Sequence, residues 1–179
     1  YLKRIKYGNH TAFYPAYVTN PTDENAIYNP AIPQDIDCFF ETVFDYGEHG
    51  SSPLPNADKI NVSYEETLKW ITRQDAFSDY RAGFDIRTYR LCQRILQFHS
   101  FEELGNVPCL VKSLDLGVAD TITGTIQETE ITHLLSVTHR GYTRNTDGGY
   151  IFRGWPKMEF DYKPLKWSTA SQNISFANM

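Results

Sequence analysis

The sequence has no apolar run that approaches the ~20 residues needed to span a bilayer as a helix. It has only three cysteines, Cys38, Cys92 and Cys109, and their odd number and irregular spacing do not form a disulfide framework. No glycine-rich phosphate-binding loop is present. These absences argue against direct membrane insertion, a disulfide scaffold and nucleotide chemistry. The first residue is Tyr1 rather than Met and already lies in a strand-like stretch, and residues 168–179 are polar and irregular. We therefore expect both ends to be cuts in a longer chain.

Positive charge is also scarce: the net charge is −5 and the pI about 5.5, so no global basic field favours nucleic acid. The stretch 73–94 is locally basic and aromatic, but aspartates are interleaved with its arginines. We therefore predict that Arg81, Arg87 and Arg90 contact carboxylates or aromatic rings of the protein itself, and that nucleic acid is not a partner.

Aromatic side chains, by contrast, are abundant at 15% of the residues, and they suit a half-buried pleated sheet. Alternating apolar and polar residues predict strands over 1–7, 38–46, 84–101, 110–118, 131–137 and 157–162. We expect an all-β fold, an antiparallel sheet with long strands, long connecting loops and one or two short helical turns. The β-rich domain is expected over residues 1–165, followed by a polar linker over 166–179 towards a further domain.

Two short helical turns are predicted from capping residues. Ser63 and Glu66 have the spacing of a capping box, which predicts a short helix near 64–69. Ser100 and Glu103 repeat that spacing and predict a single helical turn.

Residues 84–101 fit two patterns. Leu91, Ile95 and Phe98 form a helical stripe, yet β-formers dominate the stretch. We predict one long strand with a phase slip near Leu91, where a bulge would absorb it.

Two further interpretations rest on the period of two in a strand. Leu110 and Leu114 are expected to share one face. His133 and His139, six residues apart, would also share a face, but at ~3.3 Å per residue they would lie about 20 Å apart. Two ligands of one metal ion must be a few ångströms apart, so these histidines do not indicate a metal site.

Glu128 and Glu130 could place two carboxylates on one face of a strand, as in ADP-ribosyltransferases. Such an enzyme would need a Ser-Thr-Ser-like strand upstream, whereas the similar stretch 168–170 lies downstream. Cys92 or Cys109 with a His and an Asp could form a nucleophilic site, but no spacing supports it. We expect no catalytic residue, no cofactor and no metal site.

The ADP-ribosyltransferase reading with Glu128 and Glu130 remains one alternative. A free-standing carbohydrate-binding module is another, and it would use exposed aromatics such as Tyr142, Tyr150 and Trp155.

Residues 73–99, RQDAFSDYRAGFDIRTYRLCQRILQFH, resemble a signature of the B components of bacterial insecticidal Tc toxin complexes. Those proteins share their N-terminal region with the SpvB virulence proteins. Further similar motifs follow the family order: YLKRIKYGN at 1–9, VFDYGEH at 43–49, LVKSLD at 110–115, LSVT at 135–138 and WPKMEFDY at 155–162. Ala76 and Gln97 depart from the usual Pro and Met of the family.

The resemblance implies a scaffold and not an enzyme. A Tc B component joins a C component in a hollow β-shell that encloses and delivers a toxic polypeptide, and its β-propeller docks on the A component. This chain would then be the stretch before the propeller in a secreted toxin complex. The family's ADP-ribosylating and self-cleaving activities belong to other parts, so no catalytic residue is carried over.

Overall fold

The computed structural model describes residues 1–12, 37–50, 57–119 and 131–162. Almost every regular element in these ranges is a strand, which confirms the all-β class. The elements are β1 (Arg4–Asn9), β2 (Cys38–Asp45), β3 (Lys59–Ile60), β4 (Thr72–Asp79), β5 (Ile86–Arg90), β6 (Arg94–His99), the 3-10 turn η1 (Glu102–Leu104), β7 (Cys109–Ala119), β8 (His133–Arg144), β9 (Tyr150–Gly154) and β10 (Met158–Glu159). No helix in the described ranges is long and apolar enough to cross a membrane.

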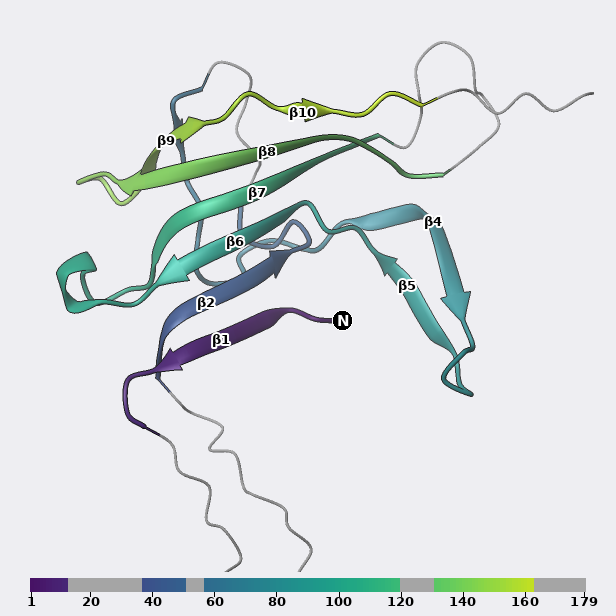
Figure 1. Ribbon diagram of the computed structural model, residues 1–179, viewed down its shortest axis with the longest axis horizontal. Coiled ribbons are helices and arrows are strands. Elements are labelled where there is room, and N and C mark those ends of the chain that lie inside the picture. Colours follow the sequence, from purple (N-terminus) through teal and green to yellow (C-terminus); the bar gives the residue numbers. More distant parts are fainter. Residues whose placement is uncertain (13–36, 51–56, 120–130, 163–179) are drawn as a thin grey trace, which may run out of the picture.

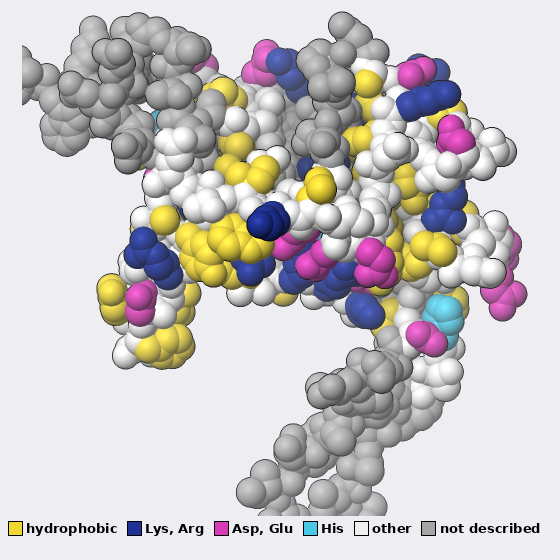
Figure 2. All heavy atoms as spheres, turned by 180° about the vertical axis from the view of Figure 1, so that it is seen from behind, with side chains coloured by type: hydrophobic (Ala, Val, Ile, Leu, Met, Phe, Trp, Pro, Cys, Tyr) yellow, Lys and Arg dark blue, Asp and Glu magenta, His cyan; other side chains and the backbone are white. Residues whose placement is uncertain are grey.

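The strands form one large antiparallel sheet and one separate ribbon (Figure 1). The sheet has the order β1-β2-β6-β7-β8-β9-β3, and β10 pairs with the half of β8 that β9 leaves free. The ribbon is the pair β4–β5, which projects away from the sheet in both views (Figures 1 and 2). Between β2 and β6, which are neighbours in the sheet, the chain forms β3 at the far edge of the sheet and then the separate ribbon.

The hydrophobic core covers one face of the sheet. Val43, Leu96, Phe98 and Leu110, from β2, β6 and β7, are almost completely buried. The segment 57–71 crosses this face, behind the strands in Figure 1, and adds Ile60 and Val62 to the core. We call this side of the sheet the covered face and the opposite side the open face.

The helix predicted near residues 64–69 is wrong. The N–H groups of Thr67 and Leu68 both donate to the backbone oxygen of Glu48, at 2.9 and 3.1 Å. These groups are thus bonded to the turn after β2 and cannot form the i to i−4 bonds of a helix. The second predicted helical turn is confirmed as η1, without a side-chain cap.

The single strand predicted over 84–101 is also wrong, because β5 and β6 belong to different sheets. The chain changes sheet at the predicted slip. There Leu91 N–H donates to Ile71 O at 3.0 Å, and Gln93 N–H donates to Asp45 O at 2.8 Å. The two bonds lead to different partners, so the slip is a passage between sheets and not a bulge within one strand.

A bulge does occur in β7. Gln97 of β6 pairs with Lys112, whereas the next residue, Phe98, pairs with Leu110, so one extra residue of β7 lies between them. An extra residue shifts the alternation of faces. Leu110 therefore lies on the covered face and Leu114 on the open face, contrary to the prediction that they share one.

Strands β3, β4 and β9 are not apparent in the sequence pattern, and the strand predicted at 157–162 shrinks to β10. The ribbon explains the case of β4. Its large apolar side chains are exposed, with Phe77 at 50%, Tyr80 at 66%, Phe84 at 64% and Ile86 at 46%. A ribbon without a buried face leaves no alternating pattern to read.

Candidate functional site

The most buried polar feature is an ion pair between directly opposed residues of β2 and β6. Asp45 and Arg94 are register partners, and their side chains are 0% and 1% exposed. Asp45 Oδ2 accepts from Arg94 Nε at 2.8 Å and from Arg94 Nη2 at 2.5 Å. Arg94 Nη2 also donates to the backbone oxygen of Gly50 at 2.7 Å. The pair therefore joins two central strands to the turn after β2.

The other oxygen of Asp45 organises that turn. Asp45 Oδ1 accepts the N–H groups of Gly47 at 2.8 Å, Glu48 at 2.9 Å and His49 at 3.3 Å. A buried carboxylate with this many donors is fully satisfied. The positive φ of Gly47, 108°, lets the chain bend tightly enough for all three N–H groups to converge.

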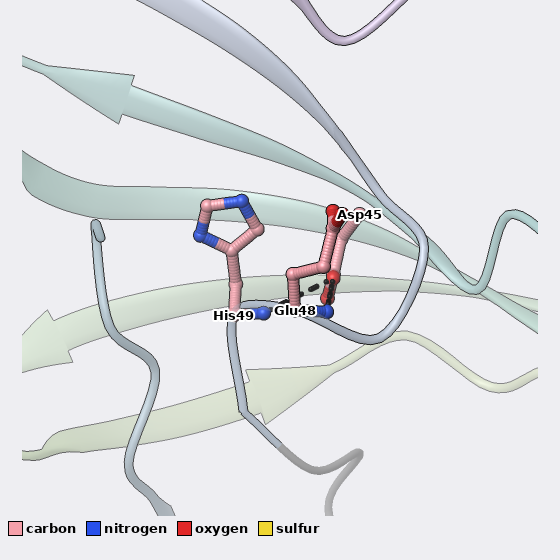
Figure 3. A group of neighbouring side chains, drawn as sticks. All are labelled: Asp45, Glu48 and His49. Atoms are coloured by element: carbon pink, nitrogen blue, oxygen red, sulfur yellow. Dashed lines mark hydrogen bonds between the residues drawn. The ribbon is translucent and has the colours of Figure 1, made fainter. Parts of the chain in front are cut away.

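Asp45, Glu48 and His49 are the strongest metal-type cluster among the described residues, with one ligand atom of each within 4.8 Å of the others (Figure 3). His49 Nδ1 lies 3.0 Å from the Ser63 carbonyl oxygen, which can only accept, so Nδ1 carries the proton. Its Nε2 is buried and has no hydrogen-bond partner in the described ranges. Burial lowers the pKa of His49 and favours the neutral ring.

Cationic side chains already occupy the carboxylates of this cluster. Arg94 holds Asp45, Lys3 Nζ donates to Glu48 Oε2, and Arg90 Nη1 lies 3.7 Å from Glu48 Oε1. A divalent ion would have to displace these groups and would add to their positive charge. The arrangement favours an ion-pair network that holds the fold together.

The side chains of the three arginines singled out in the sequence have different surroundings. Arg90 meets the prediction: its guanidinium lies 5.0 Å from the ring centroids of both Tyr1 and Trp70, near Glu48. Arg81 lies 3.9 Å from Asp79, but its side chain is 93% exposed. For Arg87 the prediction is wrong, because among the described residues its side chain donates to the hydroxyl of Ser78, at 3.3 Å, and not to a carboxylate.

Where the structure describes them, the remaining candidates for chemistry do not form a catalytic or metal-binding group. Burial raises the pKa of the Cys92 thiol, the opposite of what a nucleophile needs. Cys109 is buried in the core. A register shift in β8 lies between His133 and His139, so the expectation that they share a face is wrong. Glu128 and Glu130 lie outside the described residues.

The structure also overturns two of the three residues of the carbohydrate-binding alternative. Tyr142 is 9% exposed and Tyr150 is 4% exposed, and both belong to the core. The hydroxyl of Tyr142 lies 2.8 Å from that of Ser113. Trp155 is the only one of the three that is exposed, at 73%. One exposed tryptophan does not form an aromatic platform.

Sequence reasoning missed the Asp45–Arg94 pair, although its signal was present. Asp45 follows Val43 by two residues, and Arg94 precedes Leu96 by two, so both charges fall on the apolar face of their strands. Charged side chains are rarely buried without a partner, so an acid and a base on the buried faces of two strands predict an ion pair.

Comparisons with known proteins show which family the chain is similar to. The model of the family described as Salmonella virulence plasmid 65kDa B protein (SpvB) matches residues 1–101. Mono(ADP-ribosyl)transferase SpvB of Salmonella typhimurium (strain 14028s / SGSC 2262) is 36% identical over 115 residues. That match covers 64% of this chain, and the chain spans only 17% of the length of that protein.

Two solved structures share the fold at similar identity. The N-terminal domain of the effector protein SpvB from Salmonella typhimurium strain LT2 has a TM-score of 0.56 and 32% identity, over 80% of this chain and 38% of that one. TcdB2-TccC3 without its hypervariable C-terminal region has a TM-score of 0.59 and 31% identity, over 93% of this chain and 7% of that one. The family model covers more than half of the sequence, and this chain therefore belongs to the SpvB family.

Proposed function

We propose that the chain is a non-enzymatic, structural part of a toxin complex, a section of the β-shell that encloses and delivers a toxic polypeptide. The observation that carries the proposal is the likeness to TcdB2-TccC3 over 93% of this chain. In that assembly the matched part is 7% of a much larger chain, as expected for one section of a wall. The ADP-ribosyltransferase activity in the name of SpvB would then lie in another part of that protein.

The described side chains support a scaffold because their ionic chemistry is used internally. Three cross-strand or neighbouring pairs, Arg4–Glu41, Arg94–Asp45 and Arg140–Asp115, have nitrogen to oxygen distances of 2.6, 2.5 and 2.6 Å. Each joins strands of the main sheet. Polar groups that are satisfied within the sheet hold a fixed shape and leave little for a substrate.

The free edge of β1 supports lateral extension of the sheet. Among the described strands β1 pairs only with β2. Phe44 N–H donates to Lys3 O at 2.8 Å, so Lys3 and every second residue after it direct their backbone groups towards β2. Arg4 and Lys6 then direct theirs outward, where a further strand could pair.

The proposal extends to partners, location and chain organisation. The partners are a C component and an A component, the complex is secreted, and nucleic acid and direct membrane insertion play no part. Residues 1–165 are the shell domain, and residues 166–179, which lie outside the described ranges, are the linker to the next domain.

The test is mutagenesis in the full-length parent protein. The double variant Glu128→Gln, Glu130→Gln should leave complex assembly and toxin delivery intact. Leu110→Asp should abolish assembly, because Leu110 is 0% exposed and the variant buries an unpaired charge. Val107→Asp is the matched control, since Val107 is 56% exposed. Loss of toxicity in the Gln double variant, with assembly intact on gel filtration, would contradict the scaffold proposal and support the enzyme hypothesis.

A further inference from the structure

The two faces of the main sheet differ in charge. Glu41, Asp45 and Asp115 all point to the covered face, and each is paired there with an arginine. Glu159 of β10 is the register partner of Ser136, which places it on the same side as Asp115. Figure 2, which views this side, shows acidic and basic side chains next to one another. The negative charges of the sheet are therefore on one face and are compensated.

The open face carries the opposite pattern. The register places Lys59, Lys112 and Arg153 there, from β3, β7 and β9. His99 and His139 share that face. No Asp or Glu occupies an open-face position in the strands of the described sheet. Its positive charge is therefore not compensated within the described strands.

A hollow of about 470 Å³ lies in the middle of this face. Tyr7, Phe40, Ile95 and Leu114 supply apolar surface to its lining, and Lys112 and His99 supply polar groups. Lys112 is exposed. Burial, and secondarily the charge of Lys112, lowers the pKa of His99, so its ring is neutral and can donate or accept one hydrogen bond.

We propose that this hollow binds a carboxylate-bearing segment of a protein partner, an extended peptide in which an Asp or Glu has large apolar residues two positions before and after it. Lys112 pairs with the carboxylate, and the apolar side chains two positions away in the peptide pack on Phe40, Ile95 and Leu114. In an extended chain every second side chain points to the same side, so the carboxylate and these apolar side chains all face the hollow. The site is formed by this chain alone and does not depend on the shell role.

The direct test is a titration of the 179-residue chain with two fluorescein-labelled pentapeptides, read by fluorescence anisotropy. One peptide has leucine, glutamate and phenylalanine at positions 1, 3 and 5 with serine between them, and the other has glutamine in place of glutamate. The glutamate peptide should bind about three- to tenfold more tightly at low salt, and the difference should shrink as salt screens the ion pair. Equal affinity at low salt would overturn the proposal.

Variants locate the effect. Lys112→Met should abolish the preference for glutamate, whereas Lys69→Met, at an exposed lysine on the segment over the covered face, should keep it. Gln97→Glu places a carboxylate beside Lys112 and keeps the side-chain oxygen that accepts from Thr42. This variant should also abolish the preference for glutamate. It tests the role of Lys112 if Lys112→Met does not fold.

A preference that survives in a folded Lys112→Met or Gln97→Glu variant would refute the site. A single-stranded oligonucleotide that binds more tightly than the glutamate peptide, with the same dependence on Lys112, would overturn it in favour of nucleic acid. Neither result bears on the shell role, which is tested separately by assembly of Leu110→Asp.

Discussion

Replacement of Arg94 by alanine should destabilise the fold strongly, because the change leaves a buried carboxylate without its counter-charge. The side chain of Asp45 is 0% exposed and would keep only its three backbone donors. Truncation of one partner of a buried ion pair costs about 3–5 kcal/mol. The backbone oxygen of Gly50 would lose its donor as well. We expect a loss in this range in the free energy of unfolding.

Urea unfolding of the 179-residue chain, followed by far-UV circular dichroism, measures this loss. With a slope of about 1–3 kcal/mol per molar urea, the midpoint should fall by at least about 1 M. Arg81→Ala is the matched control, because its guanidinium is 93% exposed, and it should not shift the midpoint measurably. In a double-mutant cycle with Asp45→Asn, the two losses should not add. A loss below about 1 kcal/mol for Arg94→Ala, or strict additivity, would refute the argument.

Three other outcomes test the fold. Burial lowers the pKa of His49 below its usual 6.5, so the unfolded chain binds the proton at a higher pH than the folded chain does. The free energy of unfolding should therefore fall as the pH drops below 6.5, until the pKa of the folded state is reached. His49→Gln should reduce that pH dependence. Leu96→Ala, at 0% exposure, should cost about 2–5 kcal/mol in urea unfolding, whereas Leu104→Ala, at 37%, should cost far less. Gly50→Ala should destabilise more than Gly83→Ala in thermal melts: both have positive φ, but only at Gly50 would the added Cβ lie 2.7 Å from a backbone oxygen.

Alternation in the sequence was sufficient for the class of fold and for strands with one buried face, such as β2 and β7. It failed where the local rule was overridden by partners distant in the chain. The capping box at Ser63 predicts a helix, but the N–H groups of Thr67 and Leu68 bond to Glu48 instead. A local pattern carries no information about such long-range bonds.

The faces of β7 and β8 illustrate a second limit. An extra residue in each strand shifts the alternation of faces. Leu110 and Leu114 therefore lie on opposite faces of the sheet, and so do His133 and His139. Bulges have no firm sequence signature in a strand without glycine or proline at that point. The interpretation that no pair of candidate residues forms a catalytic site did not depend on these details.

The projecting β4–β5 ribbon determines where local unfolding of the molecule should begin. Its base is tied to the rest of the chain: the Tyr1 hydroxyl donates to Arg87 O at 2.9 Å and accepts from Tyr89 N–H at 2.6 Å, and Asp75 accepts from Thr132. Among the described residues, its far end, around Tyr80 and Gly83, is held only by hydrogen bonds within its own turn. An isolated two-stranded ribbon is at best marginally stable in water. Amide protons should therefore exchange with solvent along a gradient, fastest at the tip of the ribbon, slower at its base, and in β6 only when the whole domain unfolds.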